Sequence, residues 1–541
     1  MTKQDNAIDK RRRNNYSIAL LLERKRKMKN LKNLLKFSIL LSLILTMSVF
    51  INPNSVNAEG GENTITINNT NPGHVYNAYQ IFAGIKSDNN LNKITWGSGV
   101  SAEFKKSQEA LVYAKKIEAQ PNDIDTITED LANNLSDTYA TSTYDDTAKN
   151  YNINDLDSGY YMLVDSTNDN VKDSYSKYLV QLVGDCDVTV ELKNDTPSVT
   201  KKVKENSKEV SYDDDNKSEE YLGTGYNDVA DYCEGDHVPF ELIGTLPSNL
   251  TDYKTYKYIY HDTLSDGLDF DNDSLSITTD GKEIKDKFKV TYDNHKLTLA
   301  CDDIKTVDGI KNGSKVIVKY TATLNGQASI GQKGNKNAVT LEYSNNPTKK
   351  GEGTTGTTPK DEAIVFTYEL DANKIDSATK KVLPGAKFKL YKMNGEVKLY
   401  AGIVDGKVTS WNKIGNEIVS GSDGLFKITG LDDGEYYLEE TEAPSGYKKL
   451  NAPVKFVITA ETNNDQNWNG DPATALTKLS ITVNDKKQDG DAVNGIVTST
   501  VENTSSVQLP STGSQGTIAL LIGGLFTIAA AILYKLRKFH D

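Results

Sequence analysis

The chain has 541 residues and a formal net charge of −13, with 25% charged and 37% hydrophobic residues. The length allows about three domains, and the composition is typical of soluble globular domains rather than of a disordered chain or a multi-span membrane protein. The acidic balance argues against nucleic-acid binding, because attraction to phosphates requires clustered Lys and Arg. With five histidines and no Cys-x-x-Cys pair we predict no metal site and no cofactor, and leave open whether Cys233 and Cys301 pair.

The first segment, residues 1–58, has the features of a secretory signal peptide. Basic residues precede an apolar run at 34–51, and small residues at 56–58 offer a cleavage site. A membrane anchor is the alternative, but the run is short and the cleavage pattern follows it. We therefore predict a secreted protein whose mature chain begins at Glu59, with Met28 as an alternative start that gives a more ordinary signal length.

Short stretches that alternate polar and apolar residues recur between residues 59 and 501, separated by Asn-Gly and Asp-Gly turns. Alternation at period two predicts antiparallel β-sandwiches, with one helical patch at 102–119, where apolar residues recur at helical spacing. A polar stretch ending at Pro197 and a Gly/Thr-rich run at 349–360 mark two boundaries. We predict an all-β fold of tandem immunoglobulin-like β-sandwich domains with a little helix in the first, at 59–197, 198–358 and 359–505.

The last segment, residues 506–541, contains three signals in order. The first is the pentapeptide Leu509, Pro510, Ser511, Thr512 and Gly513. An apolar run at 516–534 and a basic tail follow it, and the run is about long enough to span a bilayer, which predicts a transmembrane segment. A simple tail anchor is the alternative. Together the three parts resemble the cell-wall sorting signal of proteins that sortases attach to the wall of Gram-positive bacteria.

The resemblance to a sorting signal implies a defined chemistry. A sortase recognises the pentapeptide, cuts between Thr512 and Gly513, and holds Thr512 as a thioester on its own cysteine. An amine then attacks the Thr512 carbonyl, so that the energy of the broken peptide bond is kept in a new amide.

Four further segments carry a wider resemblance. They are residues 71–82, 258–268, 333–345 and 436–447; by resemblance, the first looks like the opening of a first domain, the second resembles a middle domain, and the third looks like the last strand of that middle domain. Residues 436–447 read Tyr-Tyr-Leu-Glu-Glu-Thr-Glu-Ala-Pro-Ser-Gly-Tyr and fit the pattern Y-x-L-x-E-T-x-A-P-x-G-Y, the E-box, at every defined position. These segments resemble the major, or backbone, pilins of sortase-assembled Gram-positive pili, which implies Cna-type sandwich domains over nearly the whole chain from Glu59 to Thr512.

The resemblance implies isopeptide bonds within domains. In this family a buried Lys attacks a nearby Asn side chain, ammonia leaves, and a neighbouring acid promotes the reaction without an enzyme. Burial favours the neutral amine and the protonated acid, and a packed core holds the groups in proximity. In the third domain the matching residues are Lys374, Asn503 and the promoting acid Glu440.

In the middle domain the matching residues are Lys201, Asn337 and the promoting acid Asp262. Lys202 is a rival on the opposite face of the strand, and Lys201 is preferred because the family usually places the bonding Lys first. The first domain offers no comparable set. Its residues 159–167 resemble a degenerate E-box with Asp165 in place of Glu, and we assign no bond there.

The resemblance also implies polymerisation through a Lys at the end of the first domain, in a motif that often reads Tyr-Pro-Lys-Asn. Residues 191–194 keep Lys193 and Asn194 but have Glu and Leu in place of Tyr and Pro. Lys193 and Thr512 are therefore the predicted intermolecular linkage. The implied partners are a pilin-type (class C) sortase, other copies of this chain, tip or base pilins, and peptidoglycan reached through a housekeeping sortase.

These observations predict a structural shaft subunit of a covalent surface pilus that is secreted, anchored to the cell wall, and supports attachment to surfaces or host cells. A monomeric wall-anchored adhesin or an accessory pilin is the alternative, although the sequence has neither stalk repeats nor a large inserted ligand-binding region. Enzyme function is not predicted, because no Ser/His/Asp or Cys/His arrangement or phosphate loop is evident and histidines are few.

Overall fold

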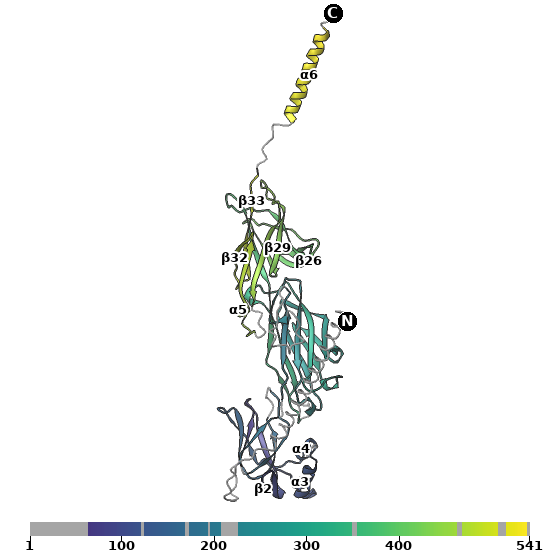
Figure 1. Ribbon diagram of the computed structural model, residues 1–541, viewed down its shortest axis with the longest axis vertical. Coiled ribbons are helices and arrows are strands. Elements are labelled where there is room, and N and C mark those ends of the chain that lie inside the picture. The colour runs from purple at the N-terminus through teal and green to yellow at the C-terminus, as the bar shows by residue number, and fades with distance from the viewer. Residues whose placement is uncertain are drawn as a thin grey trace, which may run out of the picture. The chain divides into compact units, whose positions relative to one another are not determined.

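The computed structural model describes residues 63–120, 124–167, 173–184, 186–192, 195–206, 226–348, 354–462, 468–506 and 515–537 (Figure 1). The predicted signal peptide, Lys193 and the pentapeptide at 509–513 lie outside the described residues. Within those residues the chain is built mostly from strands in five sheets, with few helices. The predicted all-β fold class is therefore confirmed. The predicted domain bounds stay predictions, and "first", "middle" and "third domain" below denote three successive groups of strands.

The first domain contains two sheets. One has the order β5-β6-β1-β9 and is formed by β1 (Asn63–Asn68), β5 (Thr143–Asp145), β6 (Asn150–Leu156) and β9 (Val188–Glu191). The other has the order β3-β2-β7-β8 with β4 beside β2, and is formed by β2 (Tyr76–Ser87), β3 (Asn90–Trp96), β4 (Ala140–Thr141), β7 (Gly159–Asp165) and β8 (Leu179–Val183). Ile65 and Ile67 of β1 pack with Tyr161 and Leu163 of β7 in one buried cluster, so the alternating apolar positions form a sandwich core.

Three helices, α2 (Ala102–Ser107), α3 (Ala110–Ala119) and α4 (Ile124–Ala132), lie beside the sheet that contains β2 (Figure 1). Phe104, Tyr113 and Leu131 pack in one cluster with Ile81 and Met162 of that sheet. The predicted helical patch at 102–119 is confirmed but is divided in two, because the backbone at Gln108 is extended with φ −163°. The hydroxyl of Ser101 caps α2 by accepting a hydrogen bond from the Phe104 amide.

The middle domain is a sandwich of two sheets. One has the order β11-β10-β13-β19-β15-β16 and is formed by β10 (Val199–Lys204), β11 (Tyr226–Asn227), β13 (His237–Thr245), β15 (Leu268–Thr279), β16 (Lys282–Glu283) and β19 (Lys315–Leu324). The other has the order β12-β22-β20-β14-β18-β17, with β21 beside β20, and is formed by β12 (Val229–Asp231), β14 (Tyr258–Leu264), β17 (Lys289–Asp293), β18 (Lys296–Cys301), β20 (Asn335–Ser344), β21 (Thr355–Thr357) and β22 (Asp361–Phe366). Phe240 and Val318 of the first sheet share a core with Tyr260 and Leu341 of the second.

The connections of the middle domain include the 3-10 helices η3 (Leu250–Asp252), η4 (Lys285–Lys287), η5 (Ile304–Thr306) and η6 (Gly331–Lys333). The chain then runs through β22, which still pairs with β20 from Asn335↔Val365 to Val339↔Asp361. Residues 361–366 thus hydrogen-bond within a middle-domain sheet, although the predicted third domain begins at 359. Cys233 and Cys301, whose pairing the sequence left open, are both buried and free.

The third domain is one curled sheet in the order β32-β31-β30-β29-β24-β25-β26-β28-β23-β33, with β27 beside β24. Its strands are β23 (Tyr368–Asp376), β24 (Lys387–Asn394), β25 (Val397–Val404), β26 (Lys407–Asn412), β27 (Ile418–Val419), β28 (Leu425–Leu431), β29 (Gly434–Glu442), β30 (Val454–Thr462), β31 (Leu476–Val483), β32 (Lys486–Asp489) and β33 (Ile496–Asn503), with the short helix α5 (Pro472–Ala475) before β31. The domain's first and last strands, β23 and β33, pair in parallel over their length.

The C-terminal segment forms helix α6 (Gln515–Arg537). Among the residues that the structure describes, no helix has the length and apolar character needed to cross a membrane. The predicted transmembrane segment at 516–534 is therefore wrong.

Candidate functional site

The structure brings together the three middle-domain residues that were predicted to act as a set. Lys201 lies on β10 in one sheet, whereas Asp262 on β14 and Asn337 on β20 lie in the facing sheet. The Lys201 Nζ contacts both carboxylate oxygens of Asp262, at 2.7 and 2.8 Å. All three side chains are buried, so the cluster lies in the core between the two sheets.

A fourth residue of this cluster, Tyr320 on β19, was not predicted. Its hydroxyl donates to Asp262 Oδ2 at 2.5 Å and accepts a hydrogen bond from Asn337 Nδ2 at 2.7 Å. Lys201 Nζ also donates to this hydroxyl, at 3.1 Å. The alternation Val316-Ile317-Val318-Lys319-Tyr320 places Tyr320 on the inward face, but no sequence pattern indicates which groups its hydroxyl meets.

Burial shifts the pKa values of Lys201 and Tyr320 in the middle cluster. Burial lowers the pKa of Lys201 below its usual value, and the nearby Asp262 carboxylate opposes this shift only in part. Burial and the same carboxylate raise the pKa of Tyr320 well above its usual value, so the hydroxyl keeps its proton. Within the described residues Asn337 Oδ1 is buried and has no hydrogen-bond partner, which makes it a ready acceptor for a protonated acid.

The rival Lys202 points to a different carboxylate. Its Nζ contacts Asp228 Oδ1 at 2.6 Å, and both side chains are buried. Burial raises the pKa of Asp228 to about 6, although Lys202 acts in the opposite direction. Adjacent residues of β10 thus face separate acids, as expected from the alternation of a strand, and Lys201 is the one that contacts Asp262.

In the third domain Asn503 and Glu440 are in direct contact, and Lys374 lies beside them. Asn503 Nδ2 donates to Glu440 Oε2 at 3.0 Å and to the Lys448 carbonyl at 2.6 Å. The parallel register pairs Lys374 with Val501, and Lys374 Nζ donates to the Val501 carbonyl at 3.2 Å. Side chains alternate along a strand, so the side chain of Asn503, two residues beyond Val501, lies on the same face of β33 as that of Val501.

The side chains of Lys374, Glu440 and Asn503 are also buried, and some of their polar atoms lack hydrogen-bond partners among the described residues. Burial lowers the pKa of Lys374 to about 8, opposed in part by the charges of Glu440, Glu502 and Asp376. In the described part of the chain, Glu440 Oε1 and Asn503 Oδ1 have no hydrogen-bond partner. An amine with a lowered pKa, a carboxamide and an acid in a buried core are the groups that amide exchange needs.

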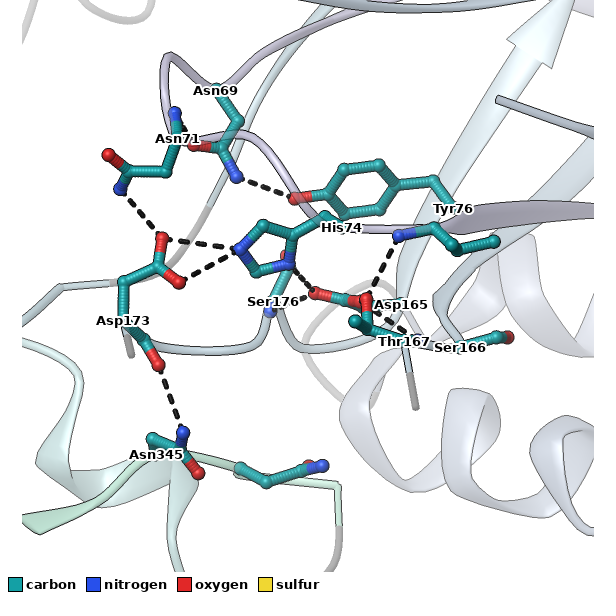
Figure 2. Close-up of polar contacts among 12 residues, drawn as sticks. Asn69, Asn71, His74, Tyr76, Asp165, Ser166, Thr167, Asp173, Ser176 and Asn345 are labelled. Atoms are coloured by element: carbon teal, nitrogen blue, oxygen red, sulfur yellow. Dashed lines mark hydrogen bonds and ion pairs between the residues drawn. The ribbon is translucent and has the colours of Figure 1, made fainter. Parts of the chain in front are cut away.

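The first domain uses the acid of its degenerate E-box differently. Figure 2 shows the imidazole of His74 between two carboxylates: Nδ1 lies 2.8 Å from Asp165 Oδ2, and Nε2 lies 3.0 Å from Asp173 Oδ1. Asp165 also accepts hydrogen bonds from the Thr167 hydroxyl and the Ser176 amide. Burial alone lowers the pKa of His74, but the hydrogen bonds and charges of Asp165 and Asp173 outweigh it and raise the pKa to about 9. The sequence analysis singled out Asp165 but did not identify His74 as its partner.

Three family models match separate parts of the chain. Residues 234–347 match a Gram-positive pilin backbone subunit 2, Cna-B-like domain. Residues 368–472 match a prealbumin-like fold domain, and residues 501–538 match an LPXTG cell wall anchor motif. The pilin backbone match includes Asp262, Tyr320 and Asn337, and the prealbumin-like match includes Lys374 and Glu440.

Two comparisons extend these matches. The trypsin-resistant surface T6 protein of Streptococcus pyogenes serotype M6 is 30% identical over 311 residues, covering 53% of this chain and 48% of that protein. The chain thus aligns with about half the length of this relative. The solved structure of the T6 backbone pilin of serotype M6 Streptococcus pyogenes, described as a modular three-domain structure, is 18% identical with a TM-score of 0.50, over 82% of this chain and 99% of that one, and it supports the fold alone. The predicted resemblance to backbone pilins and the predicted wall-anchor signal are confirmed.

Proposed function

We propose that this chain is the backbone subunit of a covalent pilus on the surface of a Gram-positive bacterium. The observation that carries the proposal is the presence, on one chain, of a pilin backbone domain at 234–347 and an LPXTG anchor motif at 501–538. A pilin-type (class C) sortase joins Thr512 of one copy to a lysine of the next, and Lys193 is the best candidate for that lysine. The last subunit is passed to peptidoglycan by a housekeeping sortase, and tip or base pilins complete the fibre.

Two isopeptide bonds, Lys201–Asn337 and Lys374–Asn503, stabilise each copy. The contacts of Lys201 with Asp262, and of Asn503 with Glu440, support this proposal. In each reaction the neutral Lys amine attacks the Asn side-chain carbonyl carbon, while the acid polarises that carbonyl. The bond to the amide nitrogen breaks and ammonia leaves. Each copy reacts once, so the cross-linking is structural maturation rather than enzyme activity.

Covalent closure suits a fibre that carries load. A domain held only by noncovalent contacts is stable by about 5–15 kcal/mol and unfolds when it is pulled. In the third domain the proposed bond joins β23 to β33, the first and last strands of that domain, which pair in parallel. In the middle domain it joins β10 to β20 across the two facing sheets. Either bond stops its domain from extending under tension.

The polymer is tested by immunoblotting wall extracts of strains that express the wild-type chain, Lys193→Ala or Lys204→Ala. Lys204 is the matched control, because its side chain is exposed and it lies at the end of β10. We expect a ladder of high-mass species in the wild type and in Lys204→Ala, and only monomer in Lys193→Ala. A ladder that survives Lys193→Ala assigns the linkage to another lysine. A single monomer band in the wild type overturns the pilus and favours a monomeric wall-anchored adhesin.

A further inference from the structure

The hydroxyl of Tyr320 contacts every group of the proposed middle-domain reaction. It is within hydrogen-bond distance of the amine of Lys201, the carboxylate of Asp262 and the amide nitrogen of Asn337. That nitrogen is the atom that must leave as ammonia. In the structure Asn337 Nδ2 donates to the hydroxyl at 2.7 Å rather than to the acid. The hydroxyl therefore lies between the acid and the leaving group.

We propose that Tyr320 relays a proton from Asp262 to the leaving nitrogen of Asn337 during formation of the middle-domain cross-link. The inference rests on the proposed Lys201–Asn337 bond and adds a fourth reacting group to it. A hydroxyl suits this task, because it donates and accepts at the same time and its hydrogen can rotate between partners.

The reaction balances with these four side chains alone. Lys201 Nζ first gives a proton to Asp262, which leaves a neutral amine and a protonated acid. The Nζ lone pair then forms a bond to Asn337 Cγ, and the carbonyl electron pair moves to Oδ1. Asp262 gives its proton to the Tyr320 oxygen as the hydroxyl proton passes to Nδ2, and Asp262 takes a second proton from Nζ. The Cγ–Nδ2 bond breaks, the Oδ1 carbonyl reforms and ammonia leaves, so Tyr320 ends unchanged.

The ring of Tyr320 is held firmly enough to position its hydroxyl. It stacks on Phe240 with ring centroids 5.6 Å apart and makes a T-shaped contact with Phe270 with centroids 5.3 Å apart. Lys201 Nζ lies over both the Phe240 and Tyr320 rings, at 5.2 and 5.4 Å from their centroids. Because burial raises the pKa of Tyr320 well above its usual value, the phenol keeps its proton and the hydroxyl can donate it.

The third domain provides an internal contrast. There the leaving nitrogen, Asn503 Nδ2, donates directly to the Glu440 carboxylate at 3.0 Å. The acid can thus return a proton to that nitrogen without an intermediate group. Removing the Tyr320 hydroxyl is therefore expected to slow the middle-domain bond and to leave the Lys374–Asn503 bond unaffected.

The test follows both cross-linked peptides by mass spectrometry in the full chain, at several times after a pulse of synthesis and at several pH values. The variants are Tyr320→Phe and the matched control Tyr260→Phe, which removes another buried hydroxyl of the same domain, one that donates to the Val316 carbonyl. For Tyr320→Phe we expect the Lys201–Asn337 peptide to form about 100-fold more slowly, at the lower end of general acid–base contributions. The Lys374–Asn503 peptide, and both peptides of Tyr260→Phe, should form at the wild-type rate.

The outcomes separate the relay from the bond on which it depends. A wild-type chain without the Lys201–Asn337 peptide overturns the proposed bond and, with it, the relay. A wild-type chain with this peptide and an unchanged rate in Tyr320→Phe overturns the relay alone. If Tyr320→Phe fails to fold, 3-fluorotyrosine at position 320 keeps the hydroxyl but makes it more acidic. The relay predicts a changed rate and a shifted pH profile, and a wild-type rate and profile would show that Tyr320 serves only packing.

Discussion

The first and third domains share a strand arrangement but differ in the groups that surround one of its acids. In each, the first strand pairs in parallel with the last, β1 with β9 and β23 with β33. Each also has a Tyr-x-Leu-x-acid strand, with Asp165 at the end of β7 and Glu440 on β29. In the third domain, Lys374 on β23 and Asn503 on β33 flank the acid, whereas β1 contains no lysine.

The difference shows that the acid alone does not determine the outcome. Glu440 contacts a carboxamide beside a lysine whose pKa burial lowers to about 8, which suits an irreversible amide exchange. Asp165 contacts His74, whose pKa is raised to about 9, and the result is a reversible pair of ion contacts with Asp165 and Asp173. The third domain should therefore be insensitive to mild changes of pH, and the first domain should respond to them.

The largest effect is expected from removing the proposed bond of the third domain. Lys374→Ala should leave one molecule of ammonia unreleased and cost about 5 kcal/mol of unfolding free energy, since the bond closes a loop of more than a hundred residues. Lys380→Ala is the control, because that lysine is exposed and its ion pair with Glu502 contributes less than about 1 kcal/mol. Denaturant unfolding of the full chain measures both variants, and equal midpoints for the two would contradict the bond.

A smaller effect, confined to the first domain, is expected from pH. The pKa of His74 is about 9 in the folded chain, against an ordinary 6.5. The contacts of protonated His74 with Asp165 and Asp173 therefore stabilise the folded state fully below pH 6.5. This stabilisation, about 3 kcal/mol in total, is lost as the pH rises through 9. The rings that pack on His74 belong to Tyr76, Tyr151 and Tyr175, and the pKa values of Tyr76 and Tyr151 are raised, so these two titrate above this window.

Calorimetry of the full chain between pH 6 and 10 measures this effect. The transition of the first domain should shift to lower temperature as the pH rises, and His74→Gln should abolish the shift. The same pH dependence in His74→Gln would assign it to another group and remove the contrast between the two domains.

Much of the architecture could be predicted, because strand alternation is a local property. The sheets and the helical patch at 102–119 follow from apolar spacing, and Ile124, Ile127 and Leu131 carry the same helical spacing for α4, which was not recognised. The apolar run at 516–534 was given too much weight, since the helix that forms there does not meet the requirements of a membrane span.

The site was only partly predictable for a physical reason. Lys201, Asp262 and Asn337 were assigned through motifs of a known family, and the structure brings them together from three strands. Tyr320 and His74 carry no motif of their own. The partners of Tyr320 are 17, 58 and 119 positions away in the sequence, and those of His74 are 91 and 99 positions away. These contacts therefore depend on tertiary packing, which local patterns do not encode.

The central claim is that the folded chain closes two of its domains with self-made amide bonds. Peptide mapping and intact-mass measurement of the full chain, purified in its folded state, test it most directly. The account predicts a mass lower by two molecules of ammonia than that calculated for the residues of the purified chain, with cross-linked peptides that join Lys201 to Asn337 and Lys374 to Asn503. A mass with no such deficit, or a middle-domain cross-link through Lys202, would contradict it.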